Sequence, residues 1–461
     1  MENYQYQVLV IGSGAAGRDA ALLAGRAGLS TLLVEGGSLG GCTFHGGCYA
    51  VRAVRACATQ FNQLAQGDRL GVFTDLVSAS LVHWLEVQRL TSSRLTKELT
   101  LELEQAHVTL RFAKAKIVGP HEVELSVNSA AENRISAQHI IVATGSRPTF
   151  SGNEKARVLN TDQFLRNTQV PAHLLVVGGG YIGCELAAIY RTLGCRVTVA
   201  ETESGLLPGW DVDAGRQMHH TLTDAGVHIQ LGQKIDLEAL QQPSRSHIQL
   251  GNGTLIDPDL ILVATGRTPN VEGLGLASVG LSEQGPPTVD PQMRTAIQSI
   301  YAIGDVNGLG MLDSVASAQA RVAVNTIRGV SSVYSSHWIP RCLHTHPPIA
   351  AAGWTEAEAN AAGHEVEVFA ESLLLQTDDD ATVVQPGHLR IKLVVQSGSH
   401  RILGCLAIGV GAVEILNLIS TAIRFGLTAT QLADLSLVHP SASEALVRLL
   451  QARFDLARSG V

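Results

Sequence analysis

Two stretches of this sequence follow one plan, and this repeat limits what the chain can fold into. In each stretch a short apolar run leads into a glycine-rich turn, a helical pattern and a second apolar run that ends in a glutamate. The first stretch extends from Val8 to Glu35 and the second from Leu174 to Glu201. A strand, a glycine turn, a helix and a strand closed by an acid form the unit that binds dinucleotides. The sequence therefore predicts two such units.

The spacing within the two units is the same, because the first glycine lies 23 residues before the closing glutamate in both. The glycines of the motif are Gly12, Gly14 and Gly17 in the first unit and Gly178, Gly180 and Gly183 in the second. Such glycines let the backbone approach a pyrophosphate, and the N-terminus of the following helix supplies positive partial charge. Two sites of this kind predict two nucleotides, most economically one flavin and one nicotinamide. An ordinary glycine-rich turn is the alternative for each copy.

The closing glutamates indicate which nicotinamide nucleotide is bound. We expect Glu35 and Glu201 to accept hydrogen bonds from the adenosine ribose. A carboxylate at that place repels the 2′-phosphate of NADP. The segment from Thr202 to Asp213 contains no lysine or arginine that could bind this phosphate. The second unit is therefore predicted to bind NAD.

Further apolar runs close the two units. Ile140–Gly145 and Leu260–Gly266 each read as a strand followed by a Thr-Gly turn, and Tyr301–Asp305 reads as a strand that ends in an acid. From about residue 338 the pattern changes to short alternating strands and helices. We expect antiparallel strands and then helices at 391–395, 403–408, 413–425 and 443–453.

These patterns predict an α/β protein with two Rossmann-like dinucleotide-binding domains and a C-terminal α+β domain. The expected bounds are 1–148 with 273–337 for the flavin-binding domain, 149–272 for the NAD-binding domain and 338–461 for the C-terminal domain.

Charge and hydropathy exclude several partners. The net charge of −8 argues against a nucleic acid or an anionic membrane as the main partner. No apolar run reaches the ~18–20 residues that cross a bilayer, and the N-terminus lacks the basic region of a secretory signal. We therefore expect a cytoplasmic protein. No residue cluster predicts a metal ion, and the run from Thr377 to Asp380 is expected to be a solvated turn.

Two cysteines after the first unit predict redox chemistry. Cys42 and Cys48 lie in the glycine-rich segment Gly40–Arg52. Because structural disulfides are rare in the cytoplasm, a pair beside a flavin is expected to be a redox-active dithiol. The alternative is two unrelated small residues. The other cysteines lie in apolar stretches and are expected to be small core residues: Cys57, Cys184, Cys195, Cys342 and Cys405.

The motifs together resemble the pyridine nucleotide–disulfide oxidoreductases over nearly the whole chain, and most of all the dihydrolipoamide dehydrogenases among them. The segments that carry the resemblance, in the order of the family, are Gly12–Gly17, Ala143–Gly145, Gly178–Gly183, Ala264–Asn270, Ala302–Asp305 and His439–Glu444. The resemblance implies FAD and NAD as cofactors. It implies a homodimer joined through the C-terminal domain.

The resemblance also implies roles for single residues. For FAD binding, beside the first glycine loop and Glu35, it implies Arg52, Ala115, Thr144, Gly145 and Asp305. For NAD binding, beside the second loop and Glu201, it implies Glu185 and Gly266. His439 would be the catalytic base, contributed by the partner subunit, and Glu444 would orient its imidazole. Histidine suits this role because its pKa lies near the working pH.

The cysteine segment departs from the family pattern. The family has four residues between its cysteines, followed by Ile-Pro-Ser-Lys. Here the first cysteine comes one residue early, and Ala50 and Arg52 replace the proline and the lysine. Six residues of straight helix rise ~9 Å, whereas the Cα atoms of a disulfide lie about 4.4–6.8 Å apart. We therefore expect Cys42 in a folded-back loop outside the helix of Cys48, with Gly46 and Gly47 making the turn.

Arg52 is expected near flavin N5 in an ion pair with Glu185. The alternative for Arg52 is a surface arginine on a helix. Arginine stays charged, so it would stabilise negative charge on the reduced flavin but would be a poor proton donor.

The predicted activity is electron transfer between a dithiol or disulfide substrate and NAD(H), through Cys42, Cys48 and His439. A lipoyl group, free or on a carrier protein, is the favoured substrate. A flavoprotein that uses Cys48 alone is an alternative, such as an NADH oxidase or a coenzyme A–disulfide reductase. A redox-inactive flavoprotein that acts as a binding subunit is an alternative of another class.

Overall fold

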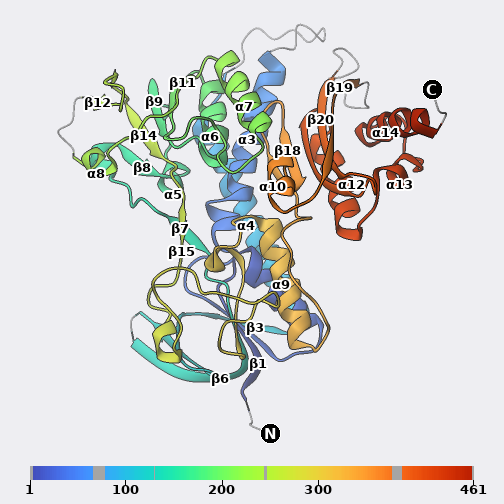
Figure 1. The fold of residues 1–461 in the computed structure, drawn as a ribbon. Helices are drawn as coiled ribbons and strands as arrows, with labels where there is room; N and C mark the ends of the chain where they lie inside the picture. Colours follow the sequence, from blue (N-terminus) through green and yellow to red (C-terminus); the bar gives the residue numbers. More distant parts are fainter. Residues whose placement is uncertain (1–3, 66–77, 129, 243–246, 376–386, 459–461) are drawn as a thin grey trace.

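The computed structural model describes residues 4–65, 78–128, 130–242, 247–375 and 387–458. The turn predicted at Thr377–Asp380 lies outside these residues. The chain builds two nucleotide-binding units and a C-terminal unit, which occupy separate parts of Figure 1. The N-terminus lies at the bottom, beside the first unit, and the C-terminus lies at the right, in the C-terminal unit.

The first unit is a sheet of order β3-β2-β1-β6-β5-β4, with β16 also paired to β6. β1, β2, β3 and β16 join the sheet in parallel, whereas β4 and β5 form an antiparallel extension of β6. The strands are β1 (Tyr6–Ile11), β2 (Thr31–Glu35), β3 (Val108–Phe112), β4 (Lys114–Gly119), β5 (Glu122–Val127), β6 (Ala130–Val142) and β16 (Ile300–Ala302). Val8, Leu9 and Val10 are fully buried, as expected for a parallel strand covered on both faces.

Helices cover this sheet and carry the cysteines. They are α1 (Ala15–Arg26), α2 (Gly41–His45), α3 (Cys48–Ala65), α4 (Leu81–Gln105) and α9 (Asp313–Ile327), with the 3-10 turns η3 (Leu276–Val279) and η4 (Gly304–Asn307). α9 comes from the later part of the chain and packs with α1 in one core. The first unit is therefore built from two separate segments of sequence.

The second unit repeats the plan in an all-parallel sheet of order β11-β10-β9-β14-β8. Its strands are β8 (Val158–Asn160), β9 (His173–Val177), β10 (Arg196–Ala200), β11 (His228–Gln230) and β14 (Leu260–Val263). Its helices are α5 (Thr161–Phe164), α6 (Tyr181–Thr192), α7 (Val212–Asp224) and α8 (Leu237–Leu240), with η2 (Glu154–Ala156) and the hairpin β12 (Ile248–Gln249) and β13 (Leu255–Ile256). Where the two units join, β7 (Ser146–Pro148) pairs antiparallel with β15 (Arg267–Pro269).

The C-terminal unit is an antiparallel sheet of order β17-β18-β21-β20-β19. Its strands are β17 (Arg341–Leu343), β18 (Ile349–Gly353), β19 (Val366–Leu375), β20 (Gly387–Gln396) and β21 (Ile402–Gly409). Its helices are α10 (Glu356–Ala361), α12 (Ala412–Phe425), α13 (Ala429–Ala433) and α14 (Ala442–Arg458). The strands predicted at 391–395 and 403–408 and both predicted helices are confirmed, and so is the fold class. The domain bounds stay our proposal.

The units share one core and an ion pair. Side chains of α3, α6 and β17 belong to the same buried cluster, for example Val54, Ala187 and Leu343. Nearby, Lys392 Nζ lies 2.9 Å from Asp211 Oδ2, and the two side chains are only 12% and 8% exposed. This pair joins β20 to the start of α7.

Every helix in the described part of the chain is too short or too polar to span a membrane.

We predict that Lys392→Met destabilises the junction between the second unit and the C-terminal unit. Removing one partner of a buried ion pair leaves an uncompensated charge, which costs about 3–5 kcal/mol. The midpoint of thermal unfolding should therefore fall, and adding Asp211→Asn should restore part of the loss. Arg390→Met is the control, because Arg390 is 41% exposed and pairs with Asp213 at 3.6 Å. Equal melting of Lys392→Met and Arg390→Met would contradict the role of the pair.

Candidate active site

Both glycine loops are held by backbone contacts that a side chain would break. Gly12 and Gly178 have φ values of +98° and +108°, and a Cβ atom at either would lie 2.5–2.6 Å from a carbonyl oxygen of the neighbouring strand end. A Cβ atom at Gly17 would overlap the carbonyl oxygen of Gly12, and one at Gly183 would overlap that of Gly178. The helix in each unit can therefore lie directly on its strand only because these residues are glycines.

The middle glycine of each loop differs from the others. A Cβ atom at Gly14 or Gly180 would meet no atom within 4 Å. The space in front of these two residues is at the N-terminus of α1 and of α6, where free backbone N–H groups attract an anion. The residues present therefore fit the pyrophosphate of a bound dinucleotide in both units.

Each of the two closing glutamates accepts a hydrogen bond from the glycine loop of its own unit. Glu35 Oε2 accepts hydrogen bonds from Ser13 N at 2.9 Å and from Ser13 Oγ at 2.5 Å. Glu201 Oε2 accepts one from Gly179 N at 2.6 Å. Each carboxylate therefore fixes the second residue of its glycine loop. Their hydrogen bonds to an adenosine ribose stay a prediction.

The Thr-Gly turns and Asp305 lie where the two nucleotide units meet. Thr144 Oγ1 donates to Asn270 O at 2.7 Å, and Asn270 N donates to Gly145 O at 2.9 Å. Gly266 O accepts from Thr149 N at 3.1 Å. Asp305, in η4 just after β16, accepts from Ser146 Oγ at 2.6 Å, and burial raises the pKa of its carboxyl group.

Ala115 lies on β4, two residues after Ala113, whose N–H donates to Glu35 O at 3.0 Å. Its position beside the end of β2 is compatible with the predicted cofactor role, which stays a prediction.

The cysteines lie on two consecutive helices directly above the first glycine loop. Cys42 is in the short helix α2, and Cys48 is the first residue of α3. Gly46 and Gly47 separate the helices, so the prediction that Cys42 lies outside the helix of Cys48 is confirmed, although Cys42 is helical and not in a loop. Gly40 N donates to Ser13 Oγ at 2.9 Å. This hydrogen bond ties the start of α2 to the nucleotide loop.

Both cysteines are free thiols in the structure. A Cβ atom at Gly47 would lie 3.3 Å from Cys42 Sγ, so the sulfur of Cys42 faces the residue just before Cys48. Each cysteine keeps an exposed edge, but the atoms packed around the sulfurs desolvate a thiolate. This desolvation raises the pKa of Cys42 to about 11 and that of Cys48 to about 12.

The predicted ion pair of Arg52 with Glu185 is wrong. Glu185, on α6, lies 3.9 Å from Arg55 Nη1 and accepts a hydrogen bond from His344 N at 2.8 Å. Arg52 instead lies over the ring of Tyr49, 5.7 Å from its centre. Arg55 follows Arg52 by three residues on α3 and so shares its face. It is Arg55 that lies level with Glu185, and only the packing of α3 on α6 could reveal this.

His439 and Glu444 form the contact that the family resemblance implies. His439 Nδ1 lies 2.7 Å from Glu444 Oε2, and Arg448 Nη2 lies 2.5 Å from the other oxygen of that carboxylate. The hydrogen bond with His439 lowers the pKa of Glu444. The imidazole itself is 68% exposed. Within the described residues of one chain it contacts neither cysteine. Its role in the active site of the partner subunit stays a prediction.

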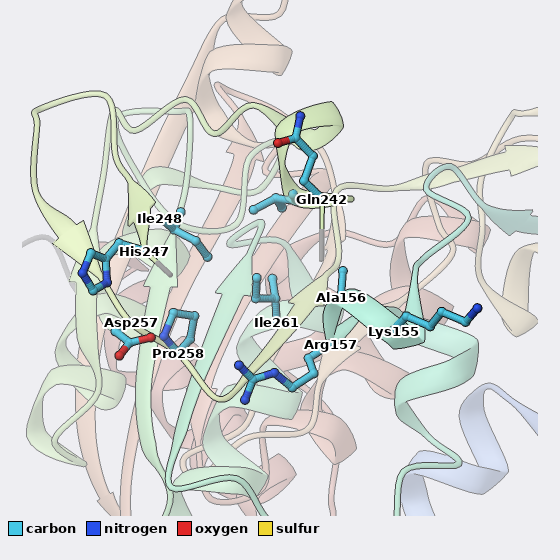
Figure 2. A pocket seen from close by; sticks show the side chains of 10 residues that line it. Lys155, Ala156, Arg157, Gln242, His247, Ile248, Asp257, Pro258 and Ile261 are labelled. Carbon is cyan, nitrogen blue, oxygen red and sulfur yellow. The ribbon is translucent and has the colours of Figure 1, made fainter. Parts of the chain in front are cut away.

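A surface hollow in the NAD unit lies apart from these groups. It is formed around β14, α8 and β12, and Figure 2 shows basic and acidic side chains at its rim, among them Lys155, Arg157 and Asp257. None of the predicted site residues lines it.

Comparison with known proteins agrees with this geometry. Residues 6–324 match the family model of the pyridine nucleotide-disulphide oxidoreductases, and residues 339–450 match the dimerisation domain of the same family. The chain belongs to this family. The family match, with relatives named dihydrolipoyl dehydrogenase, supports FAD and NAD(H) as the cofactors, and the C-terminal match supports a homodimer.

Relatives of full length carry related names. A dihydrolipoyl dehydrogenase of Chlorobaculum tepidum is 33% identical over 99% of this chain and 98% of its own length. A glutathione reductase of Burkholderia cepacia is 29% identical over 98% of this chain and 100% of its own. The crystal structure of LpdA from Mycobacterium tuberculosis superposes with a TM-score of 0.87 at 25% identity, covering 97% of this chain and 99% of that one.

The glycine geometry predicts opposite outcomes for two alanine variants of the NAD unit. Gly183→Ala places a methyl group against the backbone of Gly178 and should lower the free energy of unfolding by about 1–3 kcal/mol or more. Gly180→Ala meets open space, so its melting temperature should stay near that of the unmodified protein. The methyl group would nevertheless occupy the pyrophosphate site, and the KM for NADH should rise. A Gly180→Ala protein with unchanged KM would contradict the assignment.

Glu201→Ala is expected to weaken discrimination against NADP, because the repelling carboxylate is removed. We expect the ratio of kcat/KM for NAD⁺ to that for NADP⁺ to fall about tenfold, equivalent to about 1.4 kcal/mol. Glu203→Ala is the matched control, since this exposed neighbour contributes only its backbone N–H to Glu201. If both variants keep the original ratio, Glu201 does not select the nucleotide.

Proposed function

We propose that this family member acts as an NAD-dependent dihydrolipoyl dehydrogenase, with Cys42 and Cys48 as its redox-active pair. The observation that carries the proposal is the position of the cysteines. They lie on α2 and α3, which are separated by Gly46 and Gly47. A hydrogen bond links the start of α2 to the glycine loop that fits the first nucleotide. Similarity over the full length to proteins named dihydrolipoyl dehydrogenase supports it.

The proposed reaction begins with proton transfer. The partner subunit's His439, oriented by Glu444, takes a proton from the substrate dithiol. The substrate thiolate attacks Cys42 Sγ of the Cys42–Cys48 disulfide, that S–S bond breaks, and Cys48 leaves as a thiolate. The partner subunit's His439 passes this first proton to solvent and then takes the proton of the second substrate thiol. The second thiolate attacks the mixed disulfide, which releases a cyclic disulfide and the Cys42 thiolate.

The electron count closes through the cofactors. The dithiol loses two electrons and two protons, and the enzyme disulfide gains the two electrons. Both protons reach solvent through the partner subunit's His439. One proton is taken up again with the two electrons when NADH forms, and the Cys42–Cys48 disulfide closes as its electrons leave. Bound FAD supplies the two-electron path from the Cys48 thiolate to NAD⁺. Glycines and glutamates of the two loops bind the nucleotides in this proposal, with Thr144, Gly145, Ala115 and Asp305 beside the flavin. Arg52 is kept in this group as a cation near the flavin.

Two features favour a lipoyl substrate over glutathione disulfide. Glu201 disfavours NADPH, which glutathione-reducing enzymes generally use. The segment Leu206–Asp211 also resembles that of the lipoyl enzymes. A lipoyl-bearing carrier protein and a cytoplasmic location belong to the proposal.

A single-cysteine flavoprotein is the second candidate, because the additional residue between Cys42 and Cys48 and the contact of Cys42 with Arg267 set Cys42 apart from the family pattern. In that case Cys48 acts alone beside the flavin. Titration of free thiols before and after dithionite separates the two candidates, since only a disulfide releases two further thiols. A redox-inactive binding subunit is the third candidate, and flavin reduction by NADH in a stopped-flow trace would exclude it.

Steady-state turnover of the purified holoenzyme tests the substrate. We expect activity with NAD⁺ and dihydrolipoamide, and with NADH and lipoamide. Glutathione disulfide and coenzyme A disulfide should be poor acceptors. Strong activity with either of them, without lipoyl activity, would overturn the proposed substrate.

Cys48→Ser should abolish dithiol turnover and leave FAD bound, because the flavin-side sulfur is lost while the nucleotide loops are untouched. The visible absorption spectrum reports the bound flavin, and NADH production reports turnover. Cys57→Ser is the matched control, since Cys57 lies on the same helix, away from its first turn. Residual dithiol turnover in Cys48→Ser near that of Cys57→Ser would refute the assignment.

A further inference from the structure

Arg267 reaches from the NAD unit to the cysteine centre. It is the first residue of β15, and its side chain is only 10% exposed. Three hydrogen bonds fix its guanidinium group. Nε donates to Ser146 Oγ at 2.9 Å, Nη2 donates to Ser146 O at 2.8 Å, and Nη1 donates to Asp162 Oδ1 at 3.1 Å. A planar group held at all three nitrogens cannot swing away, so its position is set before any substrate binds.

The same guanidinium group contacts the sulfur of Cys42. Arg267 Nη2 lies 3.7 Å from Cys42 Sγ and is oriented to donate to it. This contact depends on the unusual place of the cysteine. Thr43 stands where the family pattern has its first cysteine, and its hydroxyl group donates to Asp313 Oδ1 at 3.2 Å. Adjacent residues of a helix point about 100° apart. A side chain at position 43 therefore faces Asp313, whereas the sulfur at position 42 faces Arg267.

The charges around Cys42 oppose one another. Desolvation raises the pKa of the thiol, and Arg267 is the strongest influence that lowers it. The carboxylates of Asp162 on α5, Asp305 on η4 and Asp313 on α9 raise it. Across the turn between α2 and α3, Cys48 faces the same centre from α3. A thiolate at Cys42 thus lies among acids, and within the described part of the chain Arg267 is the guanidinium group that is hydrogen-bonded to its sulfur.

We propose that Arg267 is the cation that stabilises the Cys42 thiolate during thiol–disulfide exchange. The inference rests on the proposed function, in which Cys42 is the sulfur that exchanges with substrate. Arg267 acts when the mixed disulfide between substrate and Cys42 breaks. The substrate sulfurs then bond to each other, and the electron pair of the broken bond stays on Cys42 as a thiolate. A leaving thiolate of lower pKa departs faster, and a charge-assisted hydrogen bond from arginine lowers that pKa.

Alkylation of Cys42 measures this effect without turnover. The holoenzyme is reduced anaerobically with dithiothreitol and pulsed with iodoacetamide between pH 6 and 9. Mass spectrometry then quantifies the modified Cys42 peptide. Iodoacetamide reacts with the thiolate, and well below the pKa the thiolate fraction falls tenfold for each unit by which the pKa rises. The greater nucleophilicity of a more basic thiolate offsets part of this, so the rate falls about threefold for each unit. An opposite charge within ~4–6 Å shifts a pKa by about 1–3 units.

We therefore expect Arg267→Gln to slow alkylation of Cys42 by about three- to thirtyfold at pH 7, and Arg267→Lys to slow it less. Asp162→Asn should act in the opposite direction, because it removes a carboxylate that disfavours the thiolate while both bonds from Arg267 to Ser146 remain. Arg147→Gln is the matched control. Arg147 lies on the paired strand β7 and contacts Asn270 and Glu272 instead of the cysteines.

An unchanged rate in Arg267→Gln and Arg267→Lys would overturn the proposal, and so would equal slowing in Arg147→Gln. If Arg267→Gln fails to retain FAD, the pair Arg267→Lys and Asp162→Asn still decides, because the two must shift the rate in opposite directions. Turnover separates this inference from the proposed function. Slower alkylation in a protein without lipoyl activity would support Arg267 and reject the lipoyl substrate, whereas lipoyl turnover with unchanged alkylation would reject Arg267 alone.

Discussion

The close contact of helix and strand at the two glycine loops is the constraint on which the rest of the site depends. At Gly17 and at Gly183 the helix backbone approaches so closely that a methyl group would collide with a carbonyl oxygen. This approach directs the N-terminus of each helix at the open space before the middle glycine. In the first unit it also fixes the position of Ser13. The hydroxyl group of Ser13 donates a hydrogen bond to Glu35 and accepts one from Gly40 N. The position of the cysteine helices α2 and α3 therefore depends on the glycine loop that fits a nucleotide.

The candidate active site is assembled from every unit of the chain. The first unit contributes the two cysteines, and the second contributes Arg267 and Glu185. The C-terminal unit contributes the backbone of His344, which bonds to Glu185. A packed core and the Lys392–Asp211 pair keep these units in register. Because thiol–disulfide exchange requires sulfur atoms in line and in contact, small shifts between the units would disturb the chemistry before they disturbed the fold.

Features that depend on residues close together in the sequence were predicted accurately. The βαβ units, the antiparallel strands near the C-terminus and the His439–Glu444 contact each depend on residues close in sequence or on strict periodicity. Predictions that needed distances between separate elements did less well. The sequence predicts Arg52 as the partner of Glu185, but α3 packs on α6 one turn further along and brings Arg55 there. In the sequence Arg267 is only part of a motif, and its contact with Cys42 joins residues that lie 225 positions apart.

The sequence by itself determined two nucleotide-binding units, a separate C-terminal unit and a cysteine pair with one residue more than usual between its members. Glycine spacing and apolar periodicity specify these features, because backbone sterics and burial act locally along a strand or helix. Only the tertiary structure decided which cation meets which acid or sulfur. Such contacts are set by the rotation and depth of packed helices, and a shift of one residue on a helix turns a side chain toward a different neighbour.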